Sequence, residues 1–376
     1  MIEKRKVRVH FKSNHANPKS FPPTIEGESV FAFTEARFNE ALENYPDLKG
    51  KIEPVFDWDL DNFYESMKTA EVLVCWDFPT ENLAEIAPNL RWIHITGAGV
   101  EHLCPMDWLP NNISVVNNKG VHSEKSGEFG LMSVLMLHTH IPQIIANQNN
   151  NHWESLYSTP IKGKTLLAIG VGNIGYSVAK KCKALGMNVI GVSRHGKNLE
   201  DLDEMVSTDQ LDTVLPKADY IFMATPNTTE TNNLLDERRQ SLMKPGVGIV
   251  NVGRAATMDY EALVDNLNSG HIGAAIIDVF DPEPLPKNSP LWSAPNLMVM
   301  PHISADDGDT YIVMTLELVF RNIRRYLANQ ELKNLVRPDL GYELDSPSYQ
   351  SIHLTIKIET AFNFLACLLG QCQEQK

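Results

Sequence analysis

The sequence predicts an α/β protein that is built on parallel sheets and divided into two domains. Short apolar runs rich in β-branched residues alternate with helix-length segments through most of the chain, a pattern typical of strands joined by crossover helices. A length of 376 residues favours two domains, and a composition of 43% hydrophobic and 21% charged residues can bury large cores. A glycine-rich turn at 170–175 joins a strand pattern to a helix pattern, which also indicates an α/β fold.

The first part of the chain contains the elements of a small α/β domain. A helix pattern covers 33–45, and the segment 12–30 is predicted to be a loop because it contains three prolines. The expected strands are 7–11, 70–76, 91–96 and 113–118.

A second run of strand and helix patterns begins with a long helix at 123–141. Six apolar strands follow, separated by spacers of helix length, and this describes a doubly wound sheet. Another long helix pattern covers 310–330. The six strands are expected at 165–171, 188–193, 220–225, 248–253, 274–280 and 297–301.

Composition argues against several classes of protein. A formal net charge of −14 disfavours non-specific binding to DNA or RNA, which needs a cationic surface. No apolar segment follows the basic residues at the start, and the run at 361–370 is about half the length of a membrane-spanning helix. The five cysteines are scattered without C-x-x-C pairing. We therefore expect a cytoplasmic protein with reduced thiols, no metal site and no membrane contact.

The turn GVGNIG has the glycine spacing of a dinucleotide-binding fingerprint. Gly170 would make the tight turn, Gly172 would let a pyrophosphate approach the backbone, and Gly175 would allow helix and strand to pack closely. The backbone amides of Asn173 and Ile174 would then point at the phosphates from the helix N-terminus. Because a strand pattern precedes this turn and a second strand pattern follows it, we predict a dinucleotide site here.

Three successive strand ends carry side chains suited to acid–base chemistry. Arg254 follows one strand, Asp278 and Glu283 follow the next, and His302 follows the last. Open parallel sheets bind their ligands at this edge. A guanidinium can hold a carboxylate and polarise a carbonyl, and an imidazole can protonate the alkoxide that forms. The set therefore predicts hydride transfer to a 2-oxo acid.

Further motifs lie in order between about residues 73 and 341 and identify a family. They include LRWIHITGAGVEHL, GEFGLMSVLML, GVGNIG, ATPNTTETNNLL, KPGVGIVNVGRA, IIDVFDPEPLP and PHISADD. With them the chain resembles the D-isomer-specific 2-hydroxyacid dehydrogenases, which include glyoxylate/hydroxypyruvate reductases, D-lactate dehydrogenases and phosphoglycerate dehydrogenases.

The resemblance implies a Rossmann cofactor domain inserted in a flavodoxin-like substrate domain, with a cleft between them. We place the first part of the substrate-binding domain at 1–119 and the cofactor domain at 120–302. The chain then returns to the substrate-binding domain at 303–376, with a C-terminal extension from about 342 that lies outside the family pattern. The resemblance also implies a homodimer.

It further implies roles for the residues at the strand ends. Arg254 would bind the substrate carboxylate and carbonyl, and His302 would be the general acid in reduction and the general base in oxidation. Glu283 would orient His302 and raise its pKa. The backbone amides of Ala98 and Gly99 would hold the substrate carboxylate from the other domain.

Other positions would contact the cofactor. Asp278 would meet the nicotinamide carboxamide, and Thr225, Pro226 and Val252 would line the cofactor site at neighbouring strand ends. The motif VGRA departs from the family in having Ala255 where glycine is common, a change that should leave the turn intact.

The position that selects between NAD and NADP carries no acid. An aspartate there would bind the ribose 2′-hydroxyl of NAD, but the chain has Ser193, followed by Arg194 and Lys197. These cations could pair with the 2′-phosphate of NADP. We therefore expect NADP to be preferred, with NAD possible if the cations form only a solvated turn.

The leading hypothesis is an NADPH-dependent reductase of a small 2-oxo acid such as glyoxylate or hydroxypyruvate, giving the D-2-hydroxy acid. One alternative is an NAD-linked dehydrogenase of D-lactate or a bulkier D-2-hydroxy acid. Another is a cofactor-sensing binding protein similar to the corepressors that share this fold.

Overall fold

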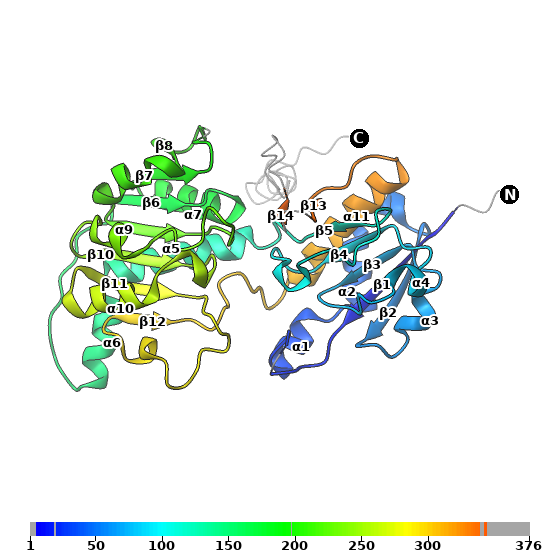
Figure 1. The fold of residues 1–376 in the computed structure, drawn as a ribbon, viewed down its shortest axis with the longest axis horizontal. Helices are drawn as coiled ribbons and strands as arrows, with labels where there is room; N and C mark the ends of the chain where they lie inside the picture. The colour runs from blue at the N-terminus through cyan, green and yellow to red at the C-terminus, as the bar shows by residue number, and fades with distance from the viewer. Residues whose placement is uncertain (1–4, 19, 197, 339–341, 344–376) are drawn as a thin grey trace, which may run out of the picture.

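The structure is a computed structural model that describes residues 5–18, 20–196, 198–338 and 342–343. The predicted tail lies almost wholly outside these residues, as does Lys197. The described part forms two lobes side by side, each built on a parallel sheet (Figure 1). No single helix among the described residues is long and apolar enough to cross a membrane. Within the same residues, only the pair α5 (Ser123–His138) and α6 (Ile141–Asn149) meets the criteria of length and composition, and the two helices are bent by 64°.

The N-terminal lobe holds a five-stranded sheet in the order β2-β1-β3-β4-β5. This is the flavodoxin-like order, whose switch point lies between β1 and β3. Its strands are β1 (Val7–Ser13), β2 (Ile52–Trp58), β3 (Val72–Cys75), β4 (Trp92–Ile95) and β5 (Ser114–Val116). Its helices are α1 (Ile25–Phe31), α2 (Glu35–Glu43), α3 (Phe63–Met67), α4 (Leu83–Ile86) and, from far along the chain, α11 (Tyr311–Leu327).

The other lobe holds a seven-stranded sheet in the order β12-β11-β10-β9-β6-β7-β8. The chain starts at β6, runs to one edge, and returns to β9 before running to the other edge, as in Rossmann folds. The strands are β6 (Thr165–Ile169), β7 (Asn188–Ser193), β8 (Glu204–Ser207), β9 (Tyr220–Met223), β10 (Val247–Asn251), β11 (Ile272–Ile277) and β12 (Leu297–Val299). The predicted class, two doubly wound parallel sheets of Rossmann and flavodoxin-like type, is thereby confirmed.

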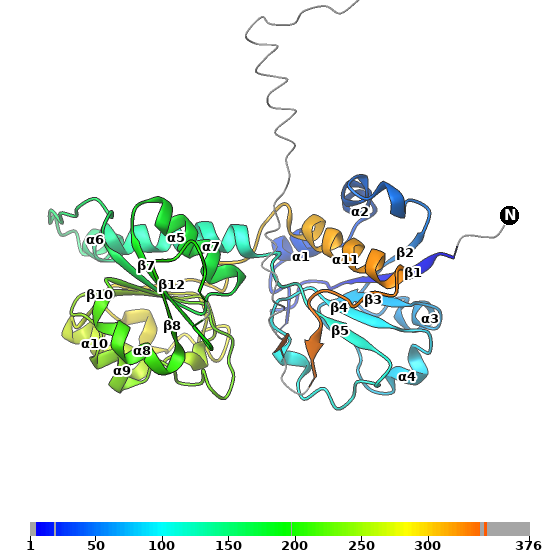
Figure 2. The ribbon, with the colours of Figure 1, turned by 90° about the horizontal axis from the view of Figure 1, so that it is seen from above.

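Helices cover both faces of each sheet, as Figure 2 shows. In the seven-stranded lobe, α5 and α7 lie on one face and α8, α9 and α10 on the other. The helices are α5 (Ser123–His138), α6 (Ile141–Asn149), α7 (Asn173–Ala184), α8 (Leu211–Val214), α9 (Glu237–Ser241) and α10 (Tyr260–Ser269). A short antiparallel pair, β13 (Val336–Arg337) and β14 (Tyr342–Glu343), follows α11.

Several predicted elements differ from the observed ones. The segment 12–30 is not all loop, because Thr24 caps the short helix α1 by accepting a hydrogen bond from the amide of Gly27. The helix predicted at 123–141 is two helices, since His140 has a left-handed backbone and the second helix begins at Ile141, with Pro142 in its first turn. The strands β2 and β8 were not predicted. Both are edge strands with partly exposed residues, so neither has a continuous apolar run.

The core of the N-terminal lobe depends on α11. Phe320 is fully buried, and its ring meets those of Phe38 and Tyr45 edge-on. Trp92 of β4 belongs to the same apolar cluster. A helix at the far end of the chain therefore completes the core begun by the first strands.

Replacing Phe320 by alanine should remove much of this packing. Phe320→Ala is expected to lower the free energy of unfolding by about 3–5 kcal/mol. The removed ring would leave a cavity, and the side chains around it are fixed on separate elements that cannot move in to fill it. Chemical denaturation followed by fluorescence measures the change. As a control, Tyr64→Ala removes an aromatic ring that is 51% exposed and should shift stability by no more than about 0.5 kcal/mol. Equal effects of the two substitutions would contradict this account of α11.

Candidate active site

The glycine turn between β6 and α7 has the shape of a phosphate-binding cradle. Gly170 has a positive φ of 89°, which favours glycine, and a Cβ at Gly175 would lie 2.1 Å from the carbonyl oxygen of Gly170. A Cβ at Gly172 would meet nothing within 4 Å. The backbone at Gly172 is thus open, and α7 begins immediately after it at Asn173. The turn therefore fits a dinucleotide pyrophosphate at a helix N-terminus, and the contact of the Asn173 and Ile174 amides with it stays a prediction.

The other predicted cofactor contacts lie along the same edge of the sheet. Thr225 and Pro226 follow β9, and Val252 follows β10. Thr225 packs against the cradle, since a Cβ on Gly170 would come within 2.8 Å of its methyl group. The buried hydroxyl of Thr225 has no hydrogen-bond partner among the described residues.

The end of β7 carries no carboxylate. Ser193 is the last residue of the strand, and the exposed Arg194 follows it. Gly196 then turns the chain with a φ of 58°. The turn therefore presents a hydroxyl and a guanidinium where an NAD-binding fingerprint has an acid.

Glu283 and His302 form a hydrogen-bonded pair. Oε2 of Glu283 lies 2.8 Å from Nδ1 of His302, and Oε1 accepts a hydrogen bond of 2.8 Å from the amide of Phe280. The carboxylate is therefore held from its other oxygen and keeps the imidazole oriented. Within the described part of the chain, Nε2 of His302 has no hydrogen-bond partner, so it is the ring nitrogen left for a ligand.

Electrostatics favours the charged form of both members of the pair. The hydrogen bond and the negative charge of Glu283 raise the pKa of His302 above its usual value, although burial opposes the shift. For Glu283 itself burial is the largest single influence and acts to raise the pKa. The hydrogen bond and charge of His302, the amide of Phe280 and the charge of Arg254 together outweigh burial, so the pKa is lowered. Arg254 is near enough for its positive charge to act on both groups.

Asp278 has a task that the sequence did not reveal. Its side chain is fully buried after β11, and its two oxygens accept hydrogen bonds from the amides of Ile303, at 2.9 Å, and Ser304, at 3.0 Å. It thus holds the backbone immediately beyond His302, whose φ is 56°. The predicted contact of Asp278 with the nicotinamide stays a prediction.

Arg254 stands at the end of β10, in a turn shaped by Asn251. The side-chain oxygen of Asn251 accepts a 2.9 Å hydrogen bond from the amide of Gly253. Arg254 then precedes a 3-10 turn that begins at Ala255, so alanine is accommodated there. Its guanidinium reaches the glycine loop of the other lobe, because a Cβ at Gly99 would lie 2.1 Å from Nη2. The structure therefore places Arg254 against the predicted loop of Ala98 and Gly99.

Sequence reasoning missed three residues near this site. Glu101 forms an ion pair with Arg254 across the two lobes. His122 is buried, which lowers its pKa to about 4, and it lies 3.3 Å from the carbonyl of Ala305. Burial raises the pKa of Asp306 to about 6 in the loop after His302. Glu101 and Asp306 had a signal in the sequence, since they lie within the motifs LRWIHITGAGVEHL and PHISADD, whereas His122 lies in none of the quoted motifs.

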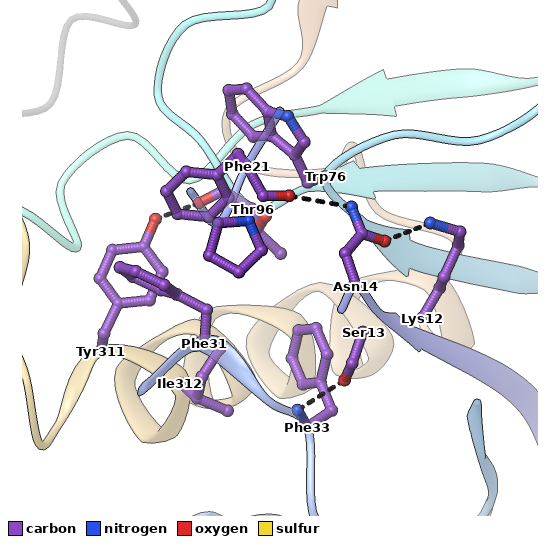
Figure 3. A pocket seen from close by; sticks show the side chains of 11 residues that line it. Lys12, Ser13, Asn14, Phe21, Phe31, Phe33, Trp76, Thr96, Tyr311 and Ile312 are labelled. Atoms are coloured by element: carbon purple, nitrogen blue, oxygen red, sulfur yellow. Dashed lines mark hydrogen bonds between the residues drawn. The ribbon is translucent and has the colours of Figure 1, made fainter. Parts of the chain in front are cut away.

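A small cavity of about 20 Å³ lies at the carboxyl ends of β1, β3 and β4, where Phe21, Phe31, Trp76 and Tyr311 surround it (Figure 3). A larger hollow of about 370 Å³ adjoins it and shares Phe21. Trp76 stacks on His102 with ring centres 4.1 Å apart, next to the loop that meets Arg254. The smaller cavity reaches the residue before the glycine loop, since Thr96 lines it.

No group of three or more His, Cys, Asp or Glu side chains in the described part of the chain is placed to hold a metal ion. The convergent groups are instead a cation, a carboxylate–imidazole pair and a cradle for a dinucleotide. Such a set can bind a 2-oxo acid, polarise its carbonyl and move one proton, while a nicotinamide carries the hydride.

Comparisons with known proteins agree with this chemistry. Residues 131–304 match the family model of the D-isomer specific 2-hydroxyacid dehydrogenase, NAD binding domain. A hydroxypyruvate reductase of Thermotoga maritima is 32% identical over 245 residues, which cover 64% of this chain and 79% of that protein. A glyoxylate reductase of Thermofilum pendens is 29% identical over 296 residues, covering 76% and 87% of the two chains.

Solved structures extend the similarity over both lobes. A D-isomer specific 2-hydroxyacid dehydrogenase from Xanthobacter autotrophicus Py2 is 25% identical, with a TM-score of 0.72. The alignment covers 90% of this chain and all of that one. The chain therefore belongs to the D-isomer specific 2-hydroxyacid dehydrogenase family and is an NAD(P)-dependent oxidoreductase.

Proposed function

We propose that this enzyme reduces a small 2-oxo acid, such as glyoxylate or hydroxypyruvate, to the D-2-hydroxy acid with NADPH. The observation that carries the proposal is the Glu283–His302 pair at the same sheet edge as Arg254 and the glycine cradle. The named relatives include a glyoxylate reductase and a hydroxypyruvate reductase, which support this class of substrate.

In this mechanism Arg254 and the amides of Ala98 and Gly99 hold the substrate carboxylate, and Arg254 polarises the carbonyl. The reduced nicotinamide, when bound, supplies the hydride to the carbonyl carbon. His302, protonated and held through Nδ1 by Glu283, gives its Nε2 proton to the oxygen that becomes the hydroxyl. In oxidation the same nitrogen takes the proton back.

The cofactor would bind to the seven-stranded lobe, and the substrate would bind mainly to the five-stranded N-terminal lobe. We propose that residues 1–119 and 303–376 form the substrate-binding domain and residues 120–302 the cofactor domain. Strand orders of the two sheets and the packing of α11 on the first sheet support this division.

NADP is the preferred cofactor in this proposal. Ser193 and Arg194 replace an acid with a hydroxyl and a cation, and Lys197, outside the described residues, would add a second cation. The related dehydrogenase from Xanthobacter autotrophicus Py2 is described in complex with NADPH. Asp278 would contact the nicotinamide carboxamide, and Thr225, Pro226 and Val252 would line the cofactor site.

We further propose a cytoplasmic homodimer. Five of the eleven exposed large hydrophobic side chains among the described residues fall between 132 and 157, on α5, α6 and the segment beyond, and Trp153 is 94% exposed. This segment runs along the outer side of the seven-stranded lobe (Figure 1). A second copy of the chain would cover such a patch, and sedimentation velocity measures the assembly directly.

Free thiols at Cys75, Cys104 and Cys182 support a reducing compartment.

A panel of 2-oxo acids assayed with NADPH tests the function. Two- and three-carbon acids should be reduced best, and His302→Ala should lower kcat/KM by about 10²–10⁴-fold because the proton donor is lost. A preference for branched or aromatic acids would overturn the substrate class. Unchanged reduction in His302→Ala would overturn the role of the histidine.

The pH dependence of reduction should follow the raised pKa of His302. Reduction needs the protonated ring, so kcat/KM should fall as pH rises through that pKa. In Glu283→Gln the pKa should drop, and the fall should move to lower pH. The surface variant Glu204→Gln, which loses only an exposed pairing with Lys217, should keep the wild-type profile. Identical profiles for Glu283→Gln and the wild type would show that another group controls the proton.

Cofactor choice should change when an acid is restored after β7. The double substitution Ser193→Asp with Arg194→Pro should lower the ratio of kcat/KM for NADPH over NADH by about ten- to a hundredfold, the effect of losing a charge-assisted contact and gaining a repulsion. Initial rates with both cofactors measure the ratio. Ser269→Asp, which adds the same charge at the exposed end of α10, should leave it unchanged. An unaltered ratio in the double variant would mean that the 2′-phosphate is held elsewhere.

A further inference from the structure

The guanidinium of Arg254 is held by a carboxylate from the opposite lobe. Nε of Arg254 lies 2.9 Å from Oε1 of Glu101, and Nη2 lies 3.4 Å from Oε2. Arg254 follows β10 of the seven-stranded sheet, whereas Glu101 begins a short 3-10 turn (Glu101–Leu103) beyond β4 of the five-stranded sheet. The contact therefore joins two segments 153 residues apart, across the two lobes.

The contact leaves Arg254 able to bind a substrate. A guanidinium has five N–H donors, and three of them are used among the described residues: Nε and Nη2 bind Glu101, and Nη1 donates to the carbonyl of Gly253 at 2.8 Å. One N–H remains on each of Nη1 and Nη2. These two nitrogens can grip a carboxylate together, so the substrate need not displace Glu101.

The backbone segment that carries Glu101 is fixed by its neighbouring residues. Val100 and Leu103 on either side of it are buried in the core of the N-terminal lobe. His102, the next residue, is 2.9 Å from the carbonyl oxygen of Trp76 and stacks on its indole ring. The backbone that carries Glu101 is thus anchored at three neighbouring positions.

Charge and space both favour this arrangement. Burial is the largest single influence on the pKa of Glu101 and acts to raise it. The positive charge of Arg254 and its hydrogen bond, with smaller contributions from the local backbone and His102, together outweigh burial, so the pKa is lowered and the carboxylate stays ionised. A Cβ at Gly99 would lie 2.1 Å from Nη2 of Arg254 and 2.3 Å from Oε2 of Glu101. The ion pair therefore rests directly on the glycine loop that the proposed mechanism uses for the substrate carboxylate.

We propose that Glu101 is a positioning residue that holds Arg254 from the opposite lobe, so that the carboxylate-binding site is complete only while the two lobes are together. The inference rests on the proposed function, because it gives Arg254 the substrate carboxylate. When the two lobes close, the same movement brings Glu101 to Arg254 and so orients the arginine. A substrate entering before the lobes meet would find an arginine free to take other rotamers.

The test compares Glu101→Gln, Glu101→Ala and Glu101→Asp with the wild type. Loss of the charged clamp should raise KM for the 2-oxo acid about tenfold or more, with a smaller fall in kcat, and leave KM for NADPH unchanged. Glu101→Asp keeps the charge and should recover part of the loss. Glu65→Gln, whose ion pair with Lys68 lies on the surface of the same lobe, is the matched control and should behave as the wild type.

Two results for Glu101→Gln would overturn the inference. A lower KM for the 2-oxo acid would mean that Glu101 competes with the substrate for Arg254, and an unchanged KM for the 2-oxo acid would mean that Glu101 does not position Arg254. Thermal unfolding of each variant identifies any that fails to fold, and Glu101→Gln, which keeps the shape of the side chain, guards against that outcome. A wild type that reduces no 2-oxo acid would refute the proposed function instead. The inference is then judged on oxalate binding by calorimetry, which should weaken about tenfold in Glu101→Gln; equal affinity would overturn it.

Discussion

Parallel pairing of β9, β10, β11 and β12 is the constraint on which the rest of the site depends. Parallel strands all end at the same edge, so residues separated by tens of positions in the chain arrive side by side. Thr225, Arg254, Asp278 and His302 each lie just beyond one of these strands. The cradle at Gly170 joins them because β6 pairs with β9. One hydrogen-bonding pattern thus places the cofactor cradle and the acid–base groups together.

Within that edge, hydrogen bonds to two carboxylates set the orientation of the His302 side chain and of the backbone beyond it. Asp278 accepts hydrogen bonds from the two amides that follow His302, and Glu283 binds the imidazole itself. Glu283 is held in turn by the amide of Phe280. Because both oxygens of the Glu283 carboxylate are hydrogen-bonded, it restricts the imidazole of His302 more tightly than an ion pair alone would. The partly exposed histidine therefore keeps one orientation.

The second lobe contributes the wall of the site and one of its charges. The glycine loop at 97–99 brings the backbone of Gly99 against Arg254, where a Cβ would lie 2.1 Å from Nη2. Glu101 then supplies the counter-charge from the same loop. Since α11 completes the core of this lobe after the chain has passed through the other one, the two lobes are linked in both directions. The proposed substrate site therefore depends on the contact between the two lobes.

The sequence by itself determined the class of fold, the glycine cradle, and the set of Arg254, Glu283 and His302, because each depends on local patterns: apolar strand periodicity, glycine spacing and polar residues just past strand ends. It did not determine the edge strands β2 and β8, whose burial is one-sided, or the helix α1, which depends on a cap at Thr24. Only the tertiary structure decided that Asp278 binds backbone amides and that Glu101 binds Arg254. Both contacts join residues far apart in the chain, 25 and 153 positions, and pairing at such separations is set by how the sheets and lobes pack, which no local pattern encodes.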